Sequence, residues 1–144
     1  MGRLLAIDVG RKRTGLAVTE HLKVIANGLT TVPTGNLFEF LEDYCKKETI
    51  ELFIIGMPTQ LNNQPSEAVK WVQPVVNRIK KLFPNIAVEL VDERFTSKLA
   101  HQAMIDGGLK KMERRNKPLV DTISATIILQ SYLESIDLQK GNKQ

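Results

Sequence analysis

Three acidic residues stand where predicted secondary-structure elements begin or end. Asp8 interrupts the apolar run "LLAIDV", Glu93 follows the run "IAVELV" and Asp92, and Asp121 lies near the start of the last apolar segment. Each alone could have a local role, as a turn residue, a surface charge or a residue at a helix N-terminus. If they met in the folded chain, a pair about 4 Å apart would cost about 4 kcal/mol in repulsion at an effective dielectric constant near 20.

A bound divalent cation would remove that repulsion. Because the ligands would all be oxygens, the expected ion is hard, Mg²⁺ or Mn²⁺, held by Asp8, Glu93 and Asp121. Such an ion accepts phosphate oxygens and activates a water molecule for in-line attack at phosphorus. The expected chemistry is therefore hydrolysis of a phosphate ester.

Basic residues lie close in sequence to each of these acids. The segment 108–117 holds five Lys or Arg and one Glu, so it alone carries the chain's net charge of +4. Such local basicity is typical of a phosphate-binding surface, although a solvated charged loop remains an alternative. The residues expected to contact nucleic acid are Arg11, Lys12, Arg13, Arg94, Lys98, Lys110, Lys111, Arg114, Arg115 and Lys117.

Few residues support any other chemistry. The chain has two histidines, His21 and His101, and neither lies in a nucleophile motif. It has no GxxxxGK[ST] phosphate loop and no GxGxxG dinucleotide motif. Its one cysteine, Cys45, cannot form an internal disulfide, which suits a reducing cytoplasm, and its place in an amphipathic helical pattern predicts a core position. The apolar runs are too short to cross a bilayer, so we expect a cytoplasmic protein with no membrane partner.

The hydrophobic pattern indicates the elements that must position the acids. It predicts strands over residues 4–9, 15–19, 24–32, 51–58 and 86–91, and helices after Asn36, around 69–83, from 96 or 97 to 107, and over 118–136. The expected fold is α/β, a mixed five-stranded sheet with its first three strands antiparallel and helices on both faces. Residues 1–136 would form one domain and 137–144 a flexible tail. Pro74 should kink the second helix, and the last helix should be mostly buried.

Four segments of the chain resemble motifs of a known family. "AIDVGRKRTGLAV", "IIGMP", "VDERFTS" and "VDTISATIILQSYL" are similar to those of the YqgF family, over residues 6–133. That family is described as pre-16S ribosomal RNA nucleases or Holliday junction resolvase-like proteins with an RNase H-like fold. The resemblance implies a metal-dependent endonuclease in which Asp8, Glu93 and Asp121 are the catalytic acids, whereas Asp92 would point to the opposite face of its strand.

The sequence departs from the pattern at two places. RuvC-type enzymes carry a second acid one turn after the first on the last helix, where this chain has Ser124. The loop after Pro58 often contains a glycine in the family, and this chain has Asn62 and Asn63 there instead. The first departure bears on the number of metal ions, one or two.

Several functions remain open at this stage. The favoured one is processing of the 5′ end of pre-16S rRNA, with resolution of Holliday-junction DNA as the alternative. Ser124 favours a third, a nucleic-acid-binding protein without catalysis. An actin-like nucleotide phosphotransferase is disfavoured, because such enzymes clasp nucleotide between two domains. The oligomeric state, monomer or weak homodimer, is also open.

Overall fold

The computed structural model describes residues 2–20, 25–57, 69–92 and 117–142. Their elements are the strands β1 (Arg3–Val9), β2 (Arg13–Thr19), β3 (Ala26–Pro33), β4 (Ile50–Met57) and β5 (Ala87–Asp92), the 3₁₀ turn η1 (Thr34–Asn36), and the helices α1 (Leu37–Lys47), α2 (Val69–Leu82) and α5 (Lys117–Asn142). The helix expected over 96–107 and most of the basic segment 108–117 lie outside the described residues.

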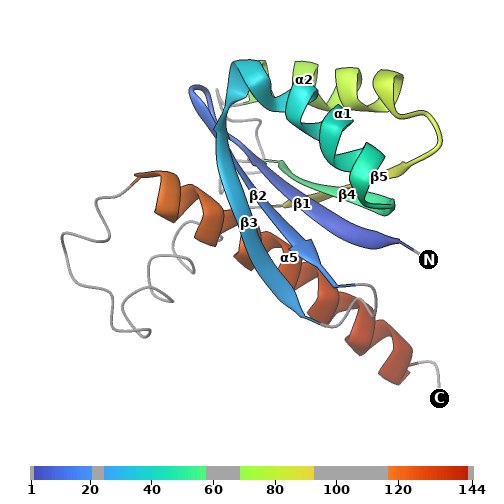
Figure 1. The fold of residues 1–144 in the computed structure, drawn as a ribbon. Coiled ribbons are helices and arrows are strands. Elements are labelled where there is room, and N and C mark those ends of the chain that lie inside the picture. The colour runs from blue at the N-terminus through green and yellow to red at the C-terminus, as the bar shows by residue number, and fades with distance from the viewer. Residues whose placement is uncertain (1, 21–24, 58–68, 93–116, 143–144) are drawn as a thin grey trace.

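The five strands form one mixed sheet in the order β3-β2-β1-β4-β5 (Figure 1). β1, β2 and β3 are antiparallel neighbours, whereas β4 is parallel to both β1 and β5. Few residues separate the antiparallel strands in sequence and many more separate the parallel ones, as chain geometry requires. The predicted sheet is confirmed, and the carboxyl ends of β1, β4 and β5 lie at one edge.

Helices cover both faces of this sheet, as predicted (Figure 1). Side chains alternate along β1, so Leu5 and Ile7 belong to one core cluster and Leu4 and Ala6 to the other. The first cluster includes residues of α1 and α2, and the second includes residues of α5. Cys45 is partly buried against the first cluster, in agreement with its expected core position.

The last helix differs from its prediction in two respects. It continues to Asn142 instead of ending near Ile136, because no proline or glycine interrupts the chain before Gly141. It is also buried along one stripe only, since it covers a single face of the sheet. That stripe consists of Ala125, Ile128, Leu129 and Leu133, whereas Gln130 and Glu134 are exposed.

Two smaller features concern the other helices. Asn36 precedes α1, but its side chain makes no capping hydrogen bond, because the 3₁₀ turn Thr34–Asn36 leads directly into the helix. α2 runs through Pro74 as one helix.

Candidate active site

Asp8 lies on the face of the sheet that α5 covers. Leu4 and Ala6 are buried against α5, and Asp8 follows them at the same two-residue spacing. Unlike its buried neighbours Ile7 and Val9, Asp8 is partly exposed. The acid predicted at the end of β1 therefore faces the helix that carries Asp121.

A glycine brings that helix onto the sheet beside Asp8. Asp8 pairs with Gly15 across the β1–β2 ladder, so both lie on one face. A side chain at Gly15 would overlap the backbone carbonyl of Asp121. Since Gly15 has none, α5 rests directly on β2 at this point, and two of the three predicted acids, Asp8 and Asp121, flank the contact.

Asp121 is held by a basic residue of the β1–β2 turn. Nε of Arg13 donates to Oδ2 of Asp121 at 3.0 Å, with the two side chains 35% and 26% exposed. A hollow of about 340 Å³ adjoins this ion pair, lined by Gly10, Arg11, Lys12, Arg13 and Asp121. All three cations predicted after Asp8 thus line the same hollow as Asp121.

Thr34 fixes the turn that carries these cations. Its hydroxyl donates to the carbonyl of Gly10 at 2.7 Å, and its backbone N–H donates to the carbonyl of Lys12 at 2.9 Å. The hydroxyl of Thr14 lies 3.0 Å from that of Thr34 and is the donor, because Thr34 has used its only hydroxyl proton. Sequence patterns gave no signal for Thr34, which lies more than twenty residues after the turn.

The start of α5 is also tied to β3. The hydroxyls of Thr31 and Thr122 lie 2.6 Å apart, and Thr126 donates to the carbonyl of Thr122 at 2.9 Å. A side chain at Gly28 would meet Cγ2 of Thr122 at 2.7 Å. Gly15 and Gly28 therefore let two strands approach the same part of α5, next to Asp121.

On the other side of Asp8, β4 presents a glycine. Ile7 pairs with Ile55, and the next residue of β4, Gly56, pairs with Val91 of β5. β4 therefore contributes no side chain between Asp8 and β5 at this level. Val91 packs against the α5-side cluster, whereas Asp92 pairs with Met57, which packs in the opposite cluster.

The remaining predicted site residues are not placed. Outside the described residues lie Glu93, Arg94, Lys98, Lys110, Lys111, Arg114 and Arg115, together with His21 and His101. Lys117 begins α5. Within the described ranges, no three His, Cys, Asp or Glu residues form a group that could hold a metal ion.

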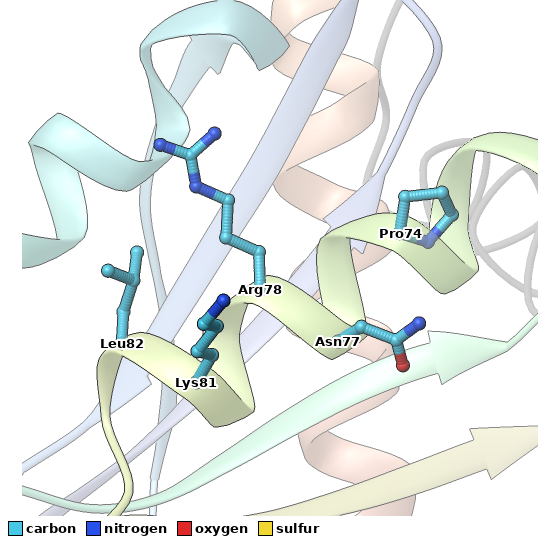
Figure 2. Close-up of a pocket in the computed structure, with 5 residues that line it drawn as sticks. All are labelled: Pro74, Asn77, Arg78, Lys81 and Leu82. Carbon is cyan, nitrogen blue, oxygen red and sulfur yellow. The ribbon is translucent and has the colours of Figure 1, made fainter.

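A larger hollow, of about 760 Å³, lies along α2 and has a different character (Figure 2). It is lined by Pro74, Asn77, Arg78, Lys81 and Leu82. Arg78 extends toward α1, and its guanidinium carbon lies 4.3 Å from the centre of the Phe38 ring. Among the described residues, this lining contains no acid, histidine or thiol, so it offers none of the carboxylate, imidazole or thiolate ligands that commonly bind metal ions.

Burial also disfavours a thiol nucleophile. It raises the pKa of the Cys45 thiol, so this side chain is protonated at neutral pH. Burial also raises the pKa of Tyr132 in α5, with a smaller contribution from Glu89 in the same direction. Neither group lines the hollow beside Asp121.

The mixed five-stranded sheet, with its first three strands antiparallel and helices on both faces, is of the RNase H-like class of α/β folds. A solved structure of this fold is T. thermophilus RuvC in complex with Holliday junction substrate. It aligns with a TM-score of 0.57 over 93% of this chain and 97% of that one, at 15% sequence identity.

The family follows from sequence comparison. A family model described as "RuvX: Holliday junction resolvase" matches residues 2–135. The chain therefore belongs to the RuvX family, and the resemblance to YqgF proteins is confirmed. No helix within the described ranges is long and apolar enough to span a membrane.

Curated relatives match over almost their whole length. A Phocaeicola vulgatus protein is 64% identical over 135 residues, covering 94% of this chain and 97% of that protein. A Bacteroides thetaiotaomicron protein is 60% identical, with 94% and 98% covered, and one from Flavobacterium johnsoniae is 53% identical, with 94% and 98% covered. Each of these relatives is named "Putative pre-16S rRNA nuclease".

Proposed function

We propose that this protein is a cytoplasmic, metal-dependent endonuclease that hydrolyses a phosphodiester bond at the 5′ end of pre-16S ribosomal RNA. One observation carries the proposal: Asp8 and Asp121 flank one contact between sheet and helix, beside a hollow lined by Arg11, Lys12 and Arg13. Acids gathered beside cations suit a site that holds a polyanion and a metal ion together. The names of the family and of the relatives agree with this assignment.

The donor groups suit Mg²⁺ or Mn²⁺. Asp8 and Asp121 offer carboxylate oxygens, which hard divalent ions prefer. We propose Glu93 as the third acid, because Val91, two residues earlier, already packs on the α5 side of the sheet. Adjacent strands lie about 4.8 Å apart, so β1 and β5, with β4 between them, are about 10 Å apart. Two carboxylate side chains can bridge that span through one ion.

We assign each group of residues a separate role in hydrolysis. The bound ion would polarise the phosphate and lower the pKa of the attacking water. Asp8, Glu93 and Asp121 would hold the ion, while Arg11 and Lys12 would bind flanking phosphates from the rim of the hollow. We assign Arg94, Lys98, Lys110, Lys111, Arg114, Arg115 and Lys117 to contacts with more distant RNA phosphates. One chain supplies every residue of this site, so a monomer or weak homodimer suffices.

Branched DNA is the second candidate substrate. The family description and the likeness to RuvC favour it, and both substrates present phosphates in the same way. A pre-16S rRNA fragment and a synthetic four-way junction should be incubated side by side with Mg²⁺ or Mn²⁺. Preferential cleavage of the RNA supports the proposal, whereas cleavage of the junction alone reassigns the substrate.

Two variants separate catalysis from contamination and from binding alone. Asp8→Asn and Asp121→Asn should each lower the cleavage rate at least a hundredfold while the RNA dissociation constant changes little. If the wild-type protein binds RNA and cleaves neither substrate, it is a binding protein of this fold, as Ser124 would favour. If cleavage survives unchanged in Asp8→Asn, the site assignment is wrong.

A further inference from the structure

Arg13 differs from the other two cations of the hollow. Its Nε donates to Asp121 at 3.0 Å, whereas Arg11 and Lys12 are exposed side chains of the turn. In the part of the chain that the structure describes, Nε is the only nitrogen of the Arg13 guanidinium that makes a hydrogen bond. Its two terminal nitrogens therefore remain available to a second acceptor while Asp121 is held.

The Arg13 backbone is fixed firmly. Arg13 is the first residue of β2 and pairs with Pro33, and the preceding turn is tied to Thr34 by two hydrogen bonds. The guanidinium thus has a fixed base from which to reach Asp121 on one side and the hollow on the other. Arg13 also places a positive charge against the Asp121 carboxylate before any metal binds.

α5 offers one carboxylate to this corner of the site. The residues one turn after Asp121 are Ser124 and Ala125, and neither is acidic. A divalent cation bound to Asp121 must therefore share that single carboxylate with the guanidinium of Arg13. Two positive charges on one carboxylate repel, even when each contacts a different oxygen.

We infer that Arg13 is a positioning residue that couples metal binding to phosphate binding. In the free protein its guanidinium holds Asp121 and weakens the site's affinity for the cation. When RNA enters the hollow, a backbone phosphate takes the guanidinium as its partner and Asp121 becomes available to the metal. This inference rests on the proposed function, because it assumes that Asp121 is a metal ligand.

The size of the coupling depends on how exposed the Arg13–Asp121 pair is to solvent. The pair is partly exposed, so its strength is modest and a divalent cation can overcome it. Charges of +2 and +1 about 6 Å apart in water change a binding constant by about tenfold, and salt with a Debye length of about 8–10 Å reduces this to about three- to fourfold. By thermodynamic linkage, the phosphate must strengthen cation binding by the same factor by which the cation strengthens phosphate binding.

Titration with Mn²⁺ alone, followed by electron paramagnetic resonance, tests the first half of the inference. Arg13→Gln should lower the Mn²⁺ dissociation constant about three- to fourfold, while Arg13→Lys, which keeps the charge, should stay within about twofold of wild type. Arg11→Gln is the matched control, since it removes a cation of the same hollow that does not hold Asp121. An equal gain in Arg11→Gln would overturn the inference, because the effect would then come from net charge and not from the ion pair.

The second half of the inference is tested by repeating the titration at 4 °C with saturating pre-16S fragment. The integrity of the RNA is checked afterwards by gel. The charge of the RNA tightens Mn²⁺ binding in every variant. The coupling is therefore measured as the excess, in wild type over Arg13→Gln, of the gain in Mn²⁺ affinity that RNA causes. We expect that excess to be about three- to fourfold and to persist in Arg11→Gln. No excess would overturn the inference while leaving the proposed function intact, whereas a wild-type protein that binds no Mn²⁺ would refute the proposed function itself.

Discussion

Gly15 of β2 lies against the backbone carbonyl of Asp121 in α5, so no side chain separates the strand from the helix at this point. Because Gly15 is also the cross-strand partner of Asp8, one glycine sets the approach of both acids. Because of this close contact, adding one methyl group at Gly15 should disturb the site.

Replacing Gly15 by alanine should therefore damage both stability and activity. The added Cβ would force α5 away from β2, which should lower the free energy of unfolding by about 1–3 kcal/mol, as overpacking does. Urea denaturation measures the loss, and the cleavage assay should show a larger loss of rate than stability alone explains. Gly35→Ala is the control, since a Cβ built there meets no atom of the described residues within 4 Å, apart from its own chain neighbours. Equal stability of the two variants would contradict the close contact.

Divalent cations should stabilise the wild-type protein. At a hundred times the dissociation constant, binding adds about 2.7 kcal/mol to the free energy of unfolding, so Mg²⁺ should raise the melting temperature. Asp8→Asn should respond much less, because it lacks one of the proposed ligands. Differential scanning fluorimetry with Mg²⁺, Mn²⁺ and a chelator checks this, and identical responses in both proteins would count against Asp8 as a ligand.

The basic segment should contribute to RNA affinity through its charge. Arg114→Ala with Arg115→Ala should weaken RNA binding and reduce the slope of log affinity against log salt by about 1.5, since each lost phosphate contact lowers it by roughly 0.7 to 0.9. Lys80→Gln with Lys81→Gln removes the same charge from the last turn of α2. If both double variants reduce the salt slope equally, the effect comes from net charge and not from contacts made by the segment 108–117.

Alkaline pH should destabilise the fold through Cys45. Burial raises the pKa of its thiol above the unfolded value, so the folded state disfavours the thiolate. The free energy of unfolding is therefore unaffected by this group below the unfolded pKa and falls as pH rises from there toward the folded pKa. Urea denaturation at pH 7 and pH 9.5 should show a smaller fall for Cys45→Ala than for wild type. An equal fall in the free energy of unfolding of both proteins would mean that other titrating groups cause the loss of stability.

Local sequence patterns predicted the elements well and the contacts between them poorly. The alternation of Leu4, Ala6 and Asp8 already indicates which side chains share a face, and short turns indicate antiparallel pairing. Adjacent acids and cations in sequence also suggested a shared site. What these patterns lack is distance information beyond a few residues.

The ion pair between Arg13 and Asp121 joins positions 108 residues apart, and no periodicity reports such a contact. Gly15 gave a weak signal, because a glycine inside a strand often marks a close backbone approach. Thr34 gave none, since its role depends on where β3 brings it. The single buried stripe of α5 was missed for a related reason: its apolar residues exceed what one sheet face can cover.

The most direct measurement is the position of Mn²⁺ in crystals of the wild-type protein, located by anomalous diffraction. We expect a single strong peak about 2.0–2.3 Å from carboxylate oxygens of both Asp8 and Asp121, the distance range for oxygen ligands of such ions. A peak that touches neither residue, in crystals where the ion is bound elsewhere at high occupancy, would contradict the account.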